Sequence, residues 1–403
     1  MKKIIIIGSI LIIILIVSTY KILSKGIDKE LKEYISTNTI ELNNINPSDD
    51  NIEGYSKLLG SVGNSRLVML GEQDHGDAAT FLAKTKIIKE LHKKKSFNVI
   101  IFESDFHNLS ISLDKEKQNN DYKKFIYPHW TECQEVSELL NFIDQNSSTI
   151  KVVGSDPRIF PNTKLDDIIN KLEKELPKEI WNESKKALKE AEVILSDDVA
   201  DDDTVNRLSE KIRQISEYLE ESTLLYQQII NLEGNLRIKI DNSNNTRDTY
   251  IAKNIEWMMK YPLKDEKVIF WAANYHIVDN FESMIEMNQR KGSKDTINVG
   301  TLLRDNLNLE SYILTFTSGR GTAGRLFGEN YEVTKTLPKS IEWEFDKLNE
   351  EYLFVNFDEN IRSKQNEKFF MKTFAGQYEY NDWTKMVDGI FYIGEMFPCS
   401  NKK

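Results

Sequence analysis

The sequence predicts an α/β fold with a mostly parallel central sheet flanked by helices. Short apolar segments of strand length recur along the chain, and stretches with the spacing of amphipathic helices lie between them. Strands that alternate with helices pair in parallel, because each helix carries the chain back across a face of the sheet. Polar side chains follow the predicted strands at their carboxyl ends, where sheets of this kind bind ligands.

The predicted elements follow one another in a regular order. Apolar strands are expected at residues 65–70, 98–102 and 150–153, with helices at 78–94 and 134–144 between them. Further strands are expected at 267–271, at 296–299 with a weaker pattern, and at 312–316. The aromatic-rich end of the chain is expected to add an edge strand at 389–393.

The pattern changes between residues 164 and 240, which carry long charged helices and no strand pattern. An acidic break at 196–203 divides this region, and Ile212, Ile215 and Leu219 keep helical spacing after it. We therefore expect an inserted antiparallel helical hairpin, which serves either as a lid over a cleft or as a structural buttress.

The N-terminus predicts a membrane anchor. Lys2 and Lys3 precede an uncharged run from Ile4 to Tyr20, which at about 1.5 Å per residue reaches about 26 Å. A cleaved signal peptide is the main alternative, but no small-residue cleavage site follows the run. We expect an uncleaved transmembrane helix at 1–25, stalk or linker helices at 26–64, and an α/β domain at 65–403 that lies outside the cytoplasm of a single-pass membrane protein.

Charge and cysteine content exclude some classes of function. The formal net charge of −11 disfavours nucleic acid as a partner. Cys133 and Cys399 stand far apart and outside any CxxC pattern, so they give no sign of a zinc or redox motif and leave a disulfide between them open. We expect no cofactor and no bound metal, and the oligomeric state is not indicated.

Candidate site residues follow four predicted strands. Because the carboxyl ends of parallel strands meet at one edge of the sheet, we expect these side chains to share a cleft. The polar residues at these ends are Glu72, Asp74, His75, Glu103, Asp105, Asp156, Asn274 and His276.

These residue types can activate water. Glu72 can hydrogen-bond one ring nitrogen of His75 and leave the other nitrogen free to take a proton. Glu103 can hold the same water, and His276 can stabilise an oxyanion or protonate a leaving group. Structural alternatives exist, since Glu72 and Asp74 can cap the following helix and Asp105 can form a turn.

The motifs resemble those of the erythromycin esterase family. Gly71-Glu72-x-x-His75-Gly76, Glu103-x-Asp105 and Trp271-Ala272-x-Asn274-x-His276 occur in the family's order, and the resemblance extends from about residue 65 to 320. Similar context surrounds Pro128-x-Trp130 and Arg247-Asp248. The resemblance implies a hydrolase of an ester or lactone in which His75 acts as general base. It places Glu72, Glu103 and Arg247 in the same polar cleft. We expect His276 to act beside His75, and we expect substrate contacts from Arg247, Asp105, Asn274, Asp74 and Trp130.

Two departures from the family pattern bear on activity. Ala273 stands where the family usually has histidine, and Asp74 where it usually has threonine. The family's best-known members open macrolactone rings, which places antibiotic resistance among the roles considered. Two alternatives remain open: a metal-dependent hydrolase that uses the same cleft, and an extracytoplasmic protein that binds haem or a glycan without catalysis.

Overall fold

The computed structural model describes residues 27–113, 121–161, 163–196, 201–241, 243–287, 296–307, 309–326, 328–364 and 368–401. Within these ranges, no helix combines the length and the apolar character that crossing a bilayer requires. The membrane anchor expected at 1–25 lies outside the described residues.

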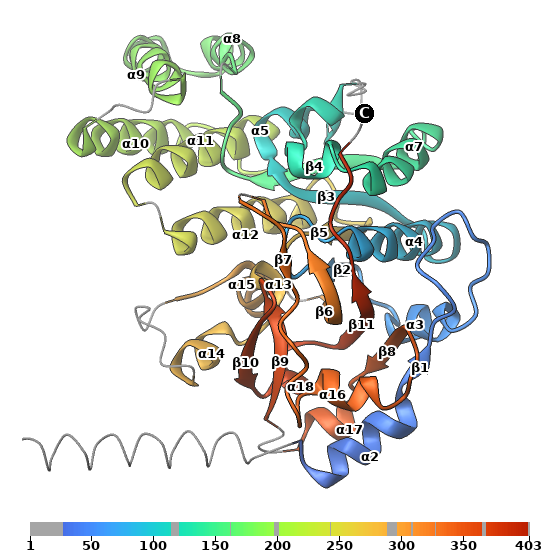
Figure 1. The fold of residues 1–403 in the computed structure, drawn as a ribbon. Helices are drawn as coiled ribbons and strands as arrows, with labels where there is room; N and C mark the ends of the chain where they lie inside the picture. Colours follow the sequence, from blue (N-terminus) through green and yellow to red (C-terminus); the bar gives the residue numbers. More distant parts are fainter. Residues whose placement is uncertain are drawn as a thin grey trace, which may run out of the picture.

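A mixed sheet forms the centre of the described part of the chain (Figure 1). It has nine strands in the order β1-β8-β11-β6-β2-β5-β3-β4, with β7 paired to the end of β6. Their bounds are β1 Ile40–Glu41, β2 Leu67–Leu70, β3 Phe97–Asp105, β4 Lys151–Asp156, β5 Lys267–Trp271, β6 Ser311–Ala323, β7 Tyr331–Glu332, β8 Tyr352–Asn356 and β11 Gly389–Met396. The strands from β11 to β4 pair in parallel, whereas β8, β1 and β7 pair antiparallel.

Alternate residues of the strands feed two cores on opposite faces of the sheet. Met69, Ile101 and Phe270 belong to one core, and their neighbours Leu70 and Phe102 belong to the other. Helix α12 (Asn244–Lys260) and α15 (Val299–Asn306) pack on the first face, and α3 (Tyr55–Ser61), α4 (Ala78–Lys95) and α7 (Ser137–Gln145) pack on the second. Both faces are covered, which explains why these strands are continuously apolar.

The insertion contains more than the expected hairpin. Its described residues form four helices, α8 (Asp166–Glu175), α9 (Lys178–Ser196), α10 (Asp202–Ser216) and α11 (Leu224–Ile240), which share a third hydrophobic core. Figure 1 shows them gathered at one end of the molecule. The hairpin prediction was wrong because the charged stretch from 164 to 196 also has one apolar face per helix, which packs inside the insertion.

Two predictions about strands were also wrong, one about whether a strand forms and one about its place in the sheet. Residues 296–299 form no strand, because Asn298 accepts a hydrogen bond from the Thr301 backbone N–H and so caps helix α15. The segment 389–393 does form a strand, but β11 lies inside the sheet between β6 and β8. Its antiparallel neighbour β8 was not recognised in the mixed C-terminal sequence.

The remaining elements complete the domain around the sheet. Helix α2 (Lys29–Asn38) places Leu31 and Ile35 in the first core, so this N-terminal segment packs on the sheet layer. A separate two-stranded ribbon joins β9 and β10. The bounds are β9 Phe369–Phe374, β10 Gln377–Asn381, α5 Phe106–Leu109, α6 Pro128–Thr131, α13 Asn274–Ile277, α14 Phe281–Met287, α16 Ile341–Asp346, α17 Glu359–Arg362 and α18 Trp383–Met386, with 3-10 helices η1 Ser110–Leu113, η2 Tyr122–Phe125 and η3 Gln134–Val136.

Candidate active site

A cavity of about 610 Å³ opens at the carboxyl ends of the parallel strands. His75, Glu103 and Arg247 border it on the polar side, and Tyr127 and Phe160 form part of an aromatic wall. His75 and Glu103, which follow two predicted strands, therefore border one cleft, and Arg247, singled out from the family motifs, joins them from α12.

The turn between β2 and α4 carries the Glu72–His75 pair. The buried carboxylate of Glu72 lies 2.9 Å from His75 Nδ1, and about one fifth of the His75 side chain is exposed. Burial alone would lower the pKa of His75, but the hydrogen bond with Glu72 and the charges of Glu103 and Glu72 outweigh it and raise that pKa above its ordinary value. His75 is thus held as a basic imidazole at the cavity wall.

Lys84 completes this pair and was missed by the sequence analysis. Its ammonium donates to the second carboxylate oxygen of Glu72 at 2.5 Å and lies 3.9 Å from the centre of the Trp271 ring. Burial lowers the pKa of Lys84 to about 8, although the Glu72 charge opposes that change. The available signal was a lysine between Phe81 and Ile88 on the apolar face of a predicted helix.

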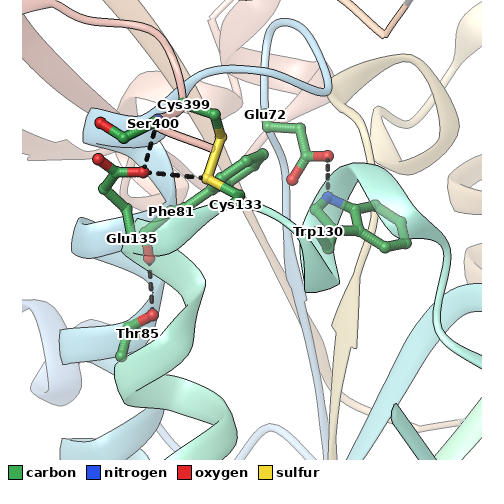
Figure 2. Close-up of a disulfide and its surroundings, with 8 residues drawn as sticks. All are labelled: Glu72, Phe81, Thr85, Trp130, Cys133, Glu135, Cys399 and Ser400. Carbon is green, nitrogen blue, oxygen red and sulfur yellow. Dashed lines mark hydrogen bonds between the residues drawn. A yellow bond between two sulfur atoms is a disulfide. The ribbon is translucent and has the colours of Figure 1, made fainter. Parts of the chain in front are cut away.

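Trp130 contacts Glu72 from a different element. It lies on α6, is fully buried, and donates from Nε1 to the same Glu72 oxygen that bonds His75, at 3.1 Å. Figure 2 shows this bond beside a disulfide. The predicted substrate contact of Trp130 stays a prediction, and the described contact is with the carboxylate that holds His75.

A second cluster surrounds Arg247 on α12. Its guanidinium donates to Glu103 at 2.6 Å and to Asp156 at 2.6 and 3.0 Å. Asp156 also accepts from the hydroxyl of Tyr127 at 2.8 Å. Burial would raise the pKa of Glu103, but the charges of His276 and Arg247 hold it well below its ordinary value, so Glu103 is a carboxylate.

His276 lies between two carboxylates of this cluster. Its Nδ1 is 2.9 Å from Asp248 and its Nε2 is 3.1 Å from Glu103. Burial would lower the pKa of His276, but Asp248 and Glu103 raise it to about 10. Both ring nitrogens lie within hydrogen-bond distance of a carboxylate, and the raised pKa favours the imidazolium form. Its Nε2 lies 3.2 Å from Arg247, and Glu103 bridges the two cations.

Two other predicted site residues hold main-chain segments. Asp105 caps α5 through Asn108 and accepts from the Phe160 backbone N–H, and burial raises its pKa to about 6. Asn274 is fully buried, and its amide bonds Phe316 and Thr373 backbone oxygens at 2.9 Å. Neither borders the cavity.

Asp74 and Ala273 are the positions that depart from the family pattern. Asp74 accepts from the His75 backbone N–H at 2.9 Å, and burial raises its pKa. Ala273 offers only a methyl group, but its backbone N–H donates to Glu103 at 3.2 Å. The main chain at 273 thus supports the second cluster without a ring nitrogen.

His129 adds a second imidazole to the cavity wall. Its ring centre lies 4.7 Å from that of His75, and its buried Nε2 has no hydrogen-bond partner among the described residues. Burial and the neighbouring His75 lower the pKa of His129 to about 3, so this ring is neutral. It contrasts with His75, whose pKa is raised.

One group of described residues has the spacing of a metal site. The ligand atoms of Cys133, Glu135 and Cys399 lie within 4.8 Å of one another. The two cysteines form a disulfide, which occupies both sulfurs. In the ionic cluster beside the cavity, the nitrogens of His276 and the oxygens of Glu103 are already paired with protein groups.

Comparison with solved structures finds the same architecture in other proteins. A Bacillus cereus crystal structure has a TM-score of 0.75 at 16% identity and covers 93% of this chain and 99% of its own. A succinoglycan biosynthesis protein gives 0.74 at 17% identity, covering 93% and 98%. A mutant of the erythromycin esterase EreC, in its open conformation, gives 0.64 at 16% identity, covering 90% and 98%. At these identities the likeness shows a shared fold.

Sequence comparison is more specific. The Bacillus subtilis protein named "Putative hydrolase YbfO" is 22% identical over 333 residues, which are 71% of this chain and 72% of that protein. Residues 92–395 match the family described as erythromycin esterase. This match spans well over half of the sequence, and the chain therefore belongs to the erythromycin esterase family, as its motifs predict.

Proposed function

We propose that this protein is a hydrolase that cleaves an ester or lactone with a water molecule activated by His75. One observation carries the proposal: buried Glu72 bonds His75 Nδ1, while the ring borders a cavity large enough for a small-molecule substrate. A carboxylate on one nitrogen fixes the tautomer in which the other nitrogen accepts a proton. Family membership supports hydrolysis as the reaction class.

The charge balance of the site favours this proton transfer. Among the bonded groups of the two clusters, the carboxylates Glu72, Glu103, Asp156 and Asp248 outnumber the cations Lys84, Arg247 and His276 by one. When neutral His75 takes a proton from water, the new imidazolium neutralises this excess. The cluster therefore stabilises the protonated base as the hydroxide attacks the carbonyl carbon.

The second cluster is proposed to stabilise the developing oxyanion. Arg247 borders the cavity and is held by Glu103 and Asp156, so its positive charge needs no reorganisation during the reaction. His276 keeps its proton and reinforces this positive edge. The leaving alkoxide then recovers the proton carried by His75, and the site returns to its initial state.

The location of the reaction is a separate proposal. The uncharged isoleucine-rich run of residues 4–20 supports a membrane tether, with the described domain outside the cytoplasm. The substrate proposed is a small ester or lactone, and a macrolide belongs in the first panel because erythromycin esterase is the name of a solved relative.

Turnover of an ester and lactone panel tests the function. The full chain is assayed with and without chelator, beside His75→Ala and the matched control His92→Ala, which removes a histidine from the far end of α4. We expect hydrolysis that survives chelation, persists in the control and disappears in His75→Ala. Chelator-sensitive turnover would support the metal-dependent alternative, and absence of turnover on every ester would contradict the proposal in favour of a binding protein.

A further inference from the structure

The C-terminal segment 397–401, here named the strap, runs between two parts of the site. On one side it pairs with the turn that carries His75. The Cys399 backbone N–H donates to the Gly76 carbonyl at 2.9 Å, and the Ala78 N–H donates to the Phe397 carbonyl at 3.1 Å. A β-bridge joins Asp77 and Pro398. The strap is thus bonded to the main chain directly after His75.

The other side of the strap is bonded to the segment that follows α6. Cys399 forms a disulfide with Cys133, across a separation of 266 residues. The Gln134 N–H donates to the Ser400 carbonyl at 2.8 Å, and Glu135 accepts from the Ser400 N–H at 3.0 Å. Figure 2 shows the disulfide, Glu135 and Ser400 on one side of Trp130 and Glu72.

The two parts joined by the strap also touch inside the site. Cys133 is three residues beyond Trp130, which donates to the Glu72 oxygen that bonds His75. The rings of His129 and His75 lie 4.7 Å apart across the same junction. The strap and these contacts therefore close a ring of interactions around the Glu72–His75 pair.

We propose that the Cys133–Cys399 disulfide is a positioning device for catalysis: through the strap it holds α6 against the Glu72–His75 turn, so that Trp130 fixes the orientation of the Glu72 carboxylate. This inference rests on the proposed function and deepens it. A cross-link at this place matters because α6 has only four residues, of which Trp130 is the buried one. Small displacements of a catalytic group cost rate steeply.

A disulfide with this positioning role makes kcat and the pKa of His75 depend on whether Cys133 and Cys399 are oxidised or reduced. A dithiol reductant would transfer two electrons and two protons, giving the thiols of Cys133 and Cys399 and its own cyclic disulfide. The half-buried Cys399 is open to such a reagent. With Trp130 released, the Glu72 carboxylate would hold His75 less firmly.

The expected change is a decrease in the pKa of His75. The groups that face this ring are Glu72, Glu103 and Asp74 on the acidic side, and His276 and His129 on the other. The hydrogen bond with Glu72 is the largest influence that raises the pKa of His75. Loosening it moves that pKa down, and the acidic limb of activity moves to lower pH.

The test compares oxidised and dithiothreitol-reduced full chain with the Cys133→Ser, Cys399→Ser double variant and with Trp130→Phe. We expect reduction to lower kcat about fivefold, which corresponds to about 1 kcal/mol, with a smaller change in KM. The double variant should have the same low kcat as the reduced wild-type chain, and the reductant should not change it. Trp130→Phe should lower kcat similarly, and reduction should add little to it.

A titration of the His75 ring by nuclear magnetic resonance, with and without reductant, needs no substrate. A lower His75 pKa after reduction supports the positioning role even if no ester in the panel is hydrolysed, which separates this inference from the proposed function. An unchanged His75 pKa and kcat, with only a fall in melting temperature, would show a purely stabilising disulfide and overturn the proposal. If the double variant does not fold, the reduced wild-type chain and Trp130→Phe decide the question.

Discussion

His75 and His276 lie in ionic clusters of similar composition, but only His75 borders the cavity. His75 has one carboxylate partner, Glu72, and borders the cavity. His276 has two, Asp248 and Glu103, and only 6% of its side chain is exposed. The pKa of His75 is raised, and that of His276 rises to about 10. The number of bonded carboxylates thus distinguishes the two rings, and in the proposed mechanism His75 exchanges a proton with water while His276 keeps its charge.

The largest expected effect concerns activity. His75→Asn should lower kcat/KM by about 10²–10⁴-fold, the usual contribution of a general base, while the free energy of unfolding changes little because the ring is partly exposed. Ester turnover and urea unfolding measure the two quantities, with His92→Asn as the matched control. Activity within a few fold of wild type would remove His75 from the mechanism.

The same substitution at His276, whose ring is buried between two carboxylates, should lower the free energy of unfolding. His276→Asn leaves the buried carboxylates of Glu103 and Asp248 short of a cation, so we expect a loss of about 3–5 kcal/mol in the free energy of unfolding. Denaturant unfolding measures it at neutral pH. A variant as stable as the wild type would contradict the fixed-cation role.

The pH dependence of stability follows from the same pKa. The folded-state pKa of His276, about 10, exceeds the ordinary 6.5, so its contribution is fully present below about 6.5 and is lost as pH rises through about 10. The free energy of unfolding, measured from mildly acidic to alkaline pH, should therefore decrease as the pH rises from about 6.5 through about 10. The decline should be smaller in His276→Asn, and equal declines in both proteins would argue against this assignment.

A smaller effect is expected on the pH profile of turnover. Activity should fall as pH drops through the raised pKa of His75, because the protonated ring cannot accept a proton. Glu72→Gln removes the charge that raises this pKa, so the acidic limb should move to lower pH. Glu395→Gln, at an exposed position on β11, is the control. An unmoved limb would mean that another group titrates.

The smallest expected effect belongs to Trp130. Trp130→Phe keeps an aromatic ring but removes the hydrogen bond to Glu72, which should cost about 1 kcal/mol and lower kcat about fivefold. Trp343→Phe, at a site 39% exposed, controls for the general effect of the substitution. A loss of several hundredfold would point instead to a direct contact between Trp130 and substrate.

The features that could be predicted from the sequence are those that depend on local patterns of residues. The strand ends brought Glu72, His75 and Glu103 to one edge, because parallel strands must align there, and the family motifs added Arg247. The family and the α/β core are confirmed. Strand polarity at β8 and β1 was not predicted, since short strands in a mixed aromatic sequence do not reveal their partners.

The missed features depend on long-range pairing. Lys84 was missed because a lysine in a helix normally faces solvent, and its partner Glu72 lies on the preceding turn. The Cys133–Cys399 disulfide joins positions 266 residues apart, and spacing alone does not indicate contact at that range. Asn274 does lie at the predicted edge of the sheet, but its side-chain amide donates to the backbone oxygens of Phe316 and Thr373.

The central claim, that His75 and His276 have different roles, is tested most directly by following both rings through one pH titration by nuclear magnetic resonance. We expect His75 to titrate above its ordinary pKa of 6.5, at the pH where the acidic limb of kcat/KM falls, and His276 to stay protonated to about pH 10. A His276 ring that loses its proton near neutrality, or an acidic limb that does not follow His75, would contradict this claim.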